Sequence, residues 1–169
     1  ENYPTLPFSK KKVKSNTPYK GTLPRRQIYP KGSTSDTDLK FSWRFECGNL
    51  DTVFAREPFV YEIHIRRDPG WTSQWYLFKC ENVLPGEYTF IITGFNRNTG
   101  MHHHLVAPVA LSMNGCKNGT SWMRLGKNIN FWKSVSGRPP EFTISFQFTV
   151  TEPDTMYFAY TYPYSYTKL

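Results

Sequence analysis

The sequence has no long hydrophobic segment and no leader-like beginning. None of its apolar runs reaches 18 residues, so we expect no membrane-spanning helix. No basic segment followed by an apolar one opens the chain, so we expect no signal peptide. The chain also starts without Met, and we therefore expect it to be a piece of a longer protein.

Cysteine is scarce as well. The three cysteines, Cys47, Cys80 and Cys116, are an odd number and contain no CxxC pair. This pattern is not that of a disulfide-rich scaffold. Reduced thiols in a cytoplasmic protein are the simpler interpretation.

The common catalytic motifs are also missing. The sequence contains no GxSxG, no GxxxxGK[ST] or GxGxxG loop and no HExxH. On a strand, His102 and His104 would share a face and could supply two metal ligands, but no acidic residue follows before Glu141. A polar loop edge is the plainer interpretation of His103 and its neighbours. We therefore expect neither a metal site nor a catalytic residue in this chain.

Positive charge is concentrated at the start of the chain. The formal charge is +8, and residues 1–40 hold nine Lys and Arg against three acidic residues. The same segment contains five prolines and a lysine-rich run at 10–14. We interpret 1–40 as a basic, extended arm and 41–169 as the folded domain. The arm could grip an acidic partner or could simply be a solvated linker.

Alternation with a period of two dominates from about residue 41. In the segment 142–151, Phe and Ile side chains point one way while Thr, Ser and Gln point the other. Segment 59–66 repeats this pattern, which is typical of a strand with one buried face. Further strands are expected at 41–46, 74–81, 87–93, 105–112, 122–125, 129–133 and 156–162. Such spacing predicts an all-β fold, an antiparallel β-sandwich of roughly eight or nine strands.

The aromatic content, 17% of the residues, has more than one explanation. Exposed aromatic and basic residues could bind single-stranded nucleic acid, but the basic residues lie in the arm and the aromatics alternate inward, so we expect no nucleic-acid partner. An exposed row of Trp71, Trp75, Trp122 and Trp132 could instead bind carbohydrate. Core packing explains the same residues equally well.

Four segments together resemble one protein family. They are FSWRFECGNL at 41–50, QWYLF at 74–78, WMRLG at 122–126 and YFAYTYPYSY at 157–166. In this order and spacing they are similar to the N-terminal β-domain of the cytosolic carboxypeptidases, zinc enzymes that trim glutamate from tubulin and other acidic tails. There are departures: Cys47 stands where the family usually has Ser, Met101 with Ala107-Pro108 only loosely echoes a Gly-Met-x-Pro element, and the segment 151–155 differs.

The resemblance implies a division of labour with a second domain. The zinc ligands and the catalytic glutamate of the family would lie in a catalytic domain after residue 169, so this chain would be a non-catalytic portion that packs on that domain and shapes substrate access. Its partners would be that domain and glutamate-rich tails such as those of tubulin. Its location would be the cytoplasm, with microtubules and cilia as places of association. The competing hypothesis is a stand-alone binding module for carbohydrate or an acidic protein.

The resemblance also points to candidate site residues. Glu46 and Asn49 would face the catalytic cleft, although Gly48-Asn49 is also a simple tight turn. Alternate tyrosines of the last segment would pack against the next domain, or else close this domain's own core. Arg124 would contact an acidic substrate or Glu46, whereas Arg44 is better explained by an ordinary ion pair. The tyrosines are Tyr160, Tyr162, Tyr164 and Tyr166.

Overall fold

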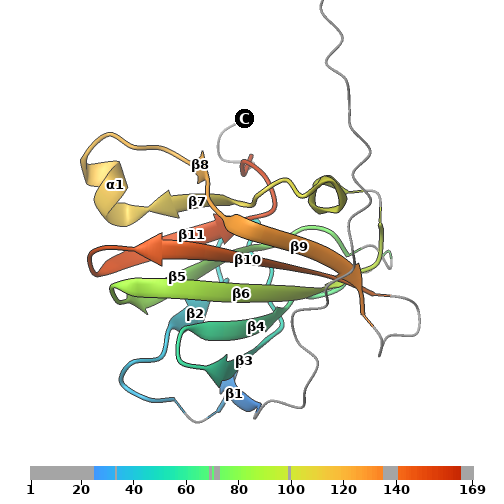
Figure 1. Cartoon of the computed structure of the whole chain (residues 1–169), viewed down its shortest axis with the longest axis horizontal. Helices are drawn as coiled ribbons and strands as arrows, with labels where there is room; N and C mark the ends of the chain where they lie inside the picture. The colour runs from blue at the N-terminus through green and yellow to red at the C-terminus, as the bar shows by residue number, and fades with distance from the viewer. Residues whose placement is uncertain are drawn as a thin grey trace, which may run out of the picture.

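The fold is two β-sheets packed face to face (Figure 1). The computed structural model describes residues 25–32, 34–68, 70, 73–98, 100–134 and 141–164, which form eleven strands. The six-stranded sheet has the order β1-β3-β4-β6-β10-β9, and the five-stranded sheet the order β2-β5-β11-β7-β8. The predicted all-β sandwich is confirmed.

The element bounds follow the chain order. The strands of the six-stranded sheet are β1 (Arg26–Tyr29), β3 (Thr52–Glu57), β4 (Val60–His64), β6 (Gly86–Phe95), β9 (Lys127–Lys133) and β10 (Phe142–Val150). Those of the five-stranded sheet are β2 (Lys40–Ser42), β5 (Leu77–Val83), β7 (Val109–Ser112), β8 (Met123–Arg124) and β11 (Asp154–Ala159). Two short helical segments flank β7, namely the 3₁₀ turn η1 (Met101–His104) and α1 (Met113–Lys117).

The alternating segments become the strands that line the core. In β10, Ile144, Phe146 and Phe148 are buried, as the sequence pattern predicts. The ring of Phe90 in β6 lies 4.9 Å from that of Phe148 and 5.0 Å from that of Phe158 in β11, centroid to centroid. Aromatic rings from both sheets therefore fill the space between them, which accounts for much of the aromatic content.

Two strands were not expected from the sequence, so the count is eleven rather than eight or nine. In β3, Val53 and Ala55 face inward, but the large Phe54 faces outward and obscures the alternation. In β1, only Ile28 is buried. One pair, β4 with β6, is parallel, because β5 lies in the other sheet and β6 returns in the direction of β4.

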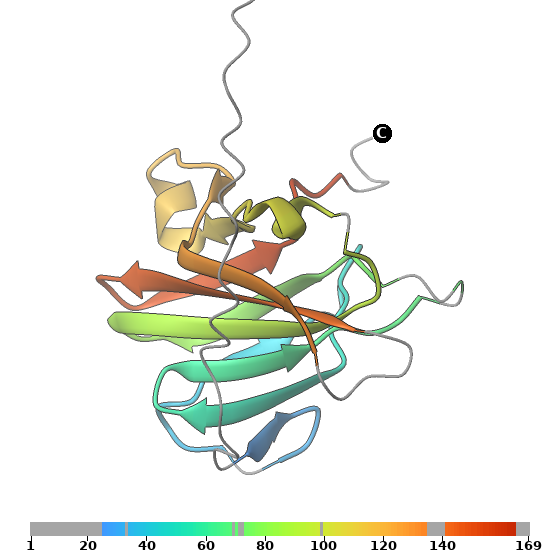
Figure 2. The same cartoon turned by 45° about the vertical axis from the view of Figure 1, so that its right-hand side comes forward.

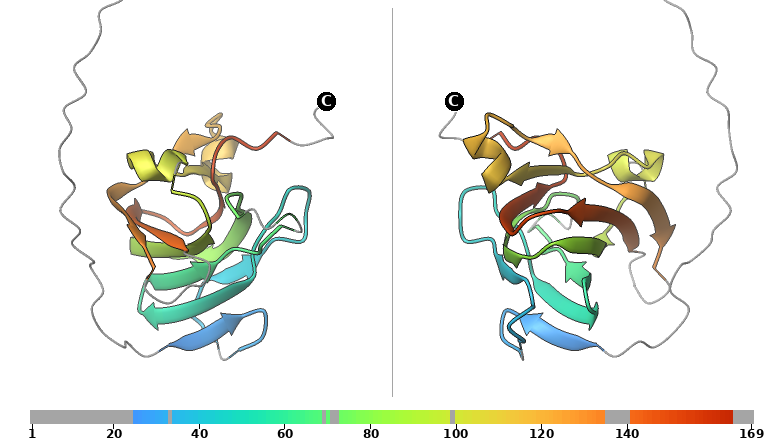
Figure 3. Two further views of the ribbon diagram at one scale, coloured as in Figure 1. Left: turned by 90° about the vertical axis from the view of Figure 1, so that its right-hand side faces the viewer. Right: turned by 60° about the vertical axis from the view of Figure 1, so that its left-hand side comes forward.

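Part of the segment predicted as an arm belongs to the sandwich. The strand β1 pairs with β3 at the lower edge of the molecule, away from β8 and α1 (Figures 2 and 3). Ile28 and Leu39 are core residues, and both oxygens of the buried Asp38 carboxylate accept hydrogen bonds from Arg26. These contacts correct the arm prediction for residues 26–40, while residues 1–24 lie outside the described part of the chain.

Several loops gather at one end of the sandwich. The strands β4 and β6 end there, and the antiparallel pairing places the beginnings of β3 and β5 beside them. The loops 43–51, 65–76 and 96–108 and the segment after β11 therefore meet at this end. The candidate residues other than Arg124 belong to these segments, and Arg124 in β8 contacts residues of two of them.

Candidate functional site

Asn49 ties three chain segments together from a buried position. It is 8% exposed, and its Nδ2 donates to the carbonyl oxygens of Trp75 and Arg66 at 2.8 and 3.1 Å. Its Oδ1 accepts from the Arg66 N–H at 3.2 Å, and its own N–H donates to the Leu77 carbonyl oxygen at 2.8 Å. Both ends of the amide are thus engaged, so Asn49 fixes neighbouring loops rather than presenting its side chain to solvent.

The turn that contains Asn49 is closed by backbone contacts. A Cβ on Gly48 would lie 1.9 Å from the Trp43 carbonyl oxygen, so only glycine fits there. Cys47 has a φ of 62°, and its carbonyl oxygen accepts from the Trp75 indole N–H at 2.7 Å. Glu46 in the same turn is exposed. The turn is therefore rigid, as a surface for specific contacts requires.

The segment after β11 begins by closing the domain. The hydroxyl of Tyr160 accepts from the Met101 N–H at 2.8 Å, and its ring meets that of His102 edge-on with centroids 4.8 Å apart. A Cβ on Gly100 would lie 2.5 Å from the same hydroxyl. Tyr160 therefore makes its described contacts within this domain, and its predicted interface role stays a prediction.

The following residues of this segment become exposed. Tyr162 and Tyr164 are 52% and 68% exposed. The guanidinium of Arg124 donates to the Ala107 carbonyl oxygen and lies 5.8 Å from the centre of the Tyr162 ring. Tyr166, the last predicted residue of this group, lies outside the described residues.

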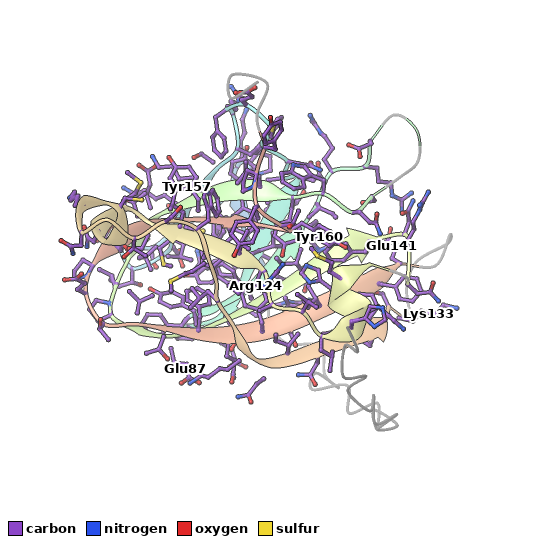
Figure 4. The ribbon with its side chains drawn as sticks, turned by 90° about the horizontal axis from the view of Figure 1, so that it is seen from above. Glu87, Arg124, Lys133, Glu141, Tyr157 and Tyr160 are labelled. Carbon is purple, nitrogen blue, oxygen red and sulfur yellow. The ribbon has the colours of Figure 1, made fainter. Side chains whose placement is uncertain are left out.

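The structure brings the predicted residues together in two groups. Tyr160 and Arg124 share Met101, since the first accepts from its backbone N–H and the second contacts its sulfur at 3.9 Å. Figure 4 shows both near the middle of one face of the molecule. The turn forms the second group, in which Phe45 meets Tyr157 of β11 edge-on at 5.7 Å. No contact printed for the described residues joins Arg124 to Glu46.

A buried histidine lies beneath the first group. His102 Nδ1 donates to the Val106 carbonyl oxygen at 2.9 Å, so Nε2 of the neutral ring accepts from the Tyr76 hydroxyl at 3.0 Å. Burial, opposed by the Val106 bond and reinforced by the charge of Arg124, lowers the pKa of His102 to about 4. Burial also raises the pKa of Tyr76 well above its usual value. Both groups are held neutral and serve packing rather than proton transfer.

The described residues offer no metal centre. No group of three or more His, Cys, Asp or Glu among them could hold an ion. His102 lies in a 3₁₀ turn rather than on a strand, and both of its ring nitrogens are already bonded. Cys80 is fully buried among apolar residues, and burial raises the pKa of its thiol, which disfavours the thiolate that a metal needs. In the part of the chain that is described, no helix is long and apolar enough to cross a membrane.

The tryptophans do not stand out as an exposed row. Trp75 and Trp122 are half-buried and pack against a small cluster formed by Leu77, Val109 and Ala159. Trp132 is also half-buried, and Trp71 lies outside the described residues. These positions agree with the core-packing explanation.

Sequence reasoning missed one exposed group at this end. The guanidinium carbon of Arg66 lies 4.9 Å from the centre of the Trp43 ring. Nothing in the sequence links these two residues or ties Arg66 to Asn49, because the contacts join loops far apart in the chain. The one available signal was that Arg66 directly follows an alternating strand segment.

Comparison with known proteins identifies relatives of the chain. No protein-family model matches it. It is 32% identical over 141 residues to cytosolic carboxypeptidase 3 of Bos taurus and 34% identical over 142 residues to cytosolic carboxypeptidase 2 of Xenopus tropicalis. Each match covers 79% of this chain but only 14% and 15% of the relatives. The chain therefore spans about a seventh of the length of these proteins.

Solved structures agree with this result. A metallo-carboxypeptidase of Pseudomonas aeruginosa matches with a TM-score of 0.53 and 25% identity, over 76% of this chain and 31% of that one. A putative carboxypeptidase A of Shewanella denitrificans shares the fold, with a TM-score of 0.54 and 22% identity. By sequence and by fold, the chain belongs to the cytosolic carboxypeptidase family and corresponds to the N-terminal β-domain of that family.

Proposed function

We propose that this chain is the non-catalytic domain of a zinc metallocarboxypeptidase that removes glutamate from acidic protein tails, such as those of tubulin. In this proposal it packs on the catalytic domain and shapes the entry of the substrate. The described residues do not fit a zinc ion, so the metal and the hydrolytic chemistry would belong to the catalytic domain. The names of the relatives support a cytoplasmic protein, and microtubules and cilia are its proposed places of association.

One observation carries the packing role. Immediately after the last strand of the sandwich, Tyr162 and Tyr164 are largely exposed beside Arg124. Met123 and Leu105, on the neighbouring β8 and after η1, are 50% and 37% exposed. Exposed aromatic and apolar side chains rimmed by an arginine are typical of a surface that another domain covers. We define this set of five residues as the exit surface.

Peptidase activity tests the proposal. We would assay an oligoglutamate-tailed peptide with the 169-residue chain and with the longer protein that contains it, and measure zinc in both. We expect glutamate release and bound zinc only in the longer protein. Release of glutamate by the chain alone would contradict the non-catalytic role, and a longer protein without glutamate release would contradict the proposed substrate.

A further inference from the structure

Arg66 is an exposed cation on a rigid support. Its guanidinium lies over the ring of Trp43, at a distance that allows a cation–π interaction. Trp43 itself packs partly buried against the main core. Because the aromatic ring restricts the long Arg side chain, less conformational entropy is lost when the guanidinium binds a ligand.

The backbone of Arg66 is held from both sides. Asn49 accepts a hydrogen bond from its N–H and donates one to its carbonyl oxygen. Asn49 is itself fixed by Trp75 and Leu77. The position of Arg66 at the end of β4 is therefore set by the same turn that contains Glu46.

The neighbouring charges single out Arg66. Arg67, the next residue, forms an ion pair with Glu141. No ion pair printed for the described residues includes Arg66, although the exposed acids Glu46, Asp51 and Asp68 belong to the same group of loops. With acids and bases mixed here, a general field of positive charge does not explain binding, whereas a fixed guanidinium fork can.

We propose that Arg66, held on Trp43 and aligned by Asn49, binds a carboxylate of an acidic polypeptide. The planar fork of a guanidinium matches a carboxylate with two parallel hydrogen bonds. The choice of an acidic polypeptide rests on the proposed function, and the inference adds the residue that would recognise it. Arg66 is thus a substrate-recognition residue of this domain, and Asn49 is its positioning residue.

Binding of a fluorescently labelled oligoglutamate peptide to the 169-residue chain tests the inference, by fluorescence anisotropy. We expect Arg66→Gln to weaken binding about tenfold, as the loss of one charge-assisted pair predicts. Arg66→Lys keeps the charge without the fork and should recover only part of the affinity. The control Arg44→Gln removes an equal charge from an exposed neighbour and should change the affinity less than about twofold. Circular dichroism would verify the fold of each variant.

Two results would overturn the inference. One is an equal loss of affinity in Arg44→Gln and Arg66→Gln, which would show unspecific attraction. The other is a folded Arg66→Gln variant that binds like the unmodified chain. An equal effect of Arg66→Gln on binding of single-stranded DNA would also contradict recognition of an acidic polypeptide.

The longer protein separates this inference from the proposed function. If it releases glutamate, we expect Arg66→Gln to raise KM about tenfold and to leave kcat nearly unchanged, because Arg66 would bind substrate away from the reacting bond. Glutamate release with an unchanged KM would defeat the inference alone. No glutamate release, together with weakened peptide binding by Arg66→Gln, would defeat the proposed function alone.

Discussion

At the scale of single residues, polar groups inside this domain are matched to partners that sequence alone does not show. Asn49 occupies a position that the sequence presents as an ordinary turn, yet its amide is buried and bonded to two other loops. His102 lies among three consecutive histidines that resemble a polar loop, yet it is 2% exposed. In both cases the partners are distant in the chain, so the residue type is visible in the sequence but the environment is not.

His102 makes the stability of the domain depend on pH. Its pKa is about 4 in the folded state and about 6.5 in an unfolded chain, so between these values only the unfolded chain takes up the proton. The free energy of unfolding should therefore fall by up to about 3 kcal/mol as the pH drops from 6.5 to 4. Urea unfolding at pH 7 and pH 5 would measure this loss.

A variant isolates the histidine from other acid-sensitive groups. His102→Gln cannot titrate, so we expect it to be less stable at pH 7 but to lose less stability on going to pH 5. The ion pairs of Glu62 do not interfere in this range. Burial opposes its ionisation, but hydrogen bonds from His64 and Arg56 outweigh burial and lower its pKa to about 2. An equal pH dependence in the variant and the unmodified chain would rule out His102 as the cause.

At the scale of elements, the sequence predicts strands best where one face is uniformly apolar. The strand β10 shows regular alternation and was expected within one residue of its observed end. The strands β1 and β3 escaped prediction because their pattern is broken. Arg26 turns inward to pair with Asp38, and Phe54 turns outward beneath the Arg25 guanidinium, 3.8 Å from its ring centre. Local alternation cannot reveal such compensations, which need residues of other elements.

The exit surface can be tested as an element separate from the core. Tyr164 is 68% exposed, so Tyr164→Ala should change the free energy of unfolding of the isolated chain by less than about 0.5 kcal/mol. The same change should weaken association with a separately produced catalytic domain, because a large aromatic contact would be lost. Isothermal titration calorimetry would measure the association, and urea unfolding the stability.

A buried residue of the same segment supplies the matched control. Tyr160 contacts Met101 and His102 inside the domain, so Tyr160→Phe should lower stability through the lost hydroxyl bond while leaving the exit surface in place. If Tyr164→Ala binds the catalytic domain as tightly as the unmodified chain does, the exit surface is not the interface.

At the scale of the whole molecule, the positive charge that stands out in the sequence is largely outside the described fold. Residues 41–169 hold twelve Lys and Arg against ten acidic residues, and the described part pairs many of them. Sequence reasoning therefore identified the fold class, the family and the segments of the site. It could not identify Arg66, because what distinguishes this arginine is its support by Trp43 and Asn49.

The order of the five-stranded sheet has a consequence for how the chain is made. The strand β11 is the last in sequence but the middle one in its sheet, between β5 and β7. A ribosome therefore releases both halves of this sheet before the strand that joins them, and Phe78 lacks its stacked partner Phe158 until then. We expect nascent chains that stop before β11 to be protease-sensitive, and protection to appear only once residue 159 has left the exit tunnel, as pulse proteolysis of stalled chains would show. Early protection would mean that the six-stranded sheet folds by itself during synthesis.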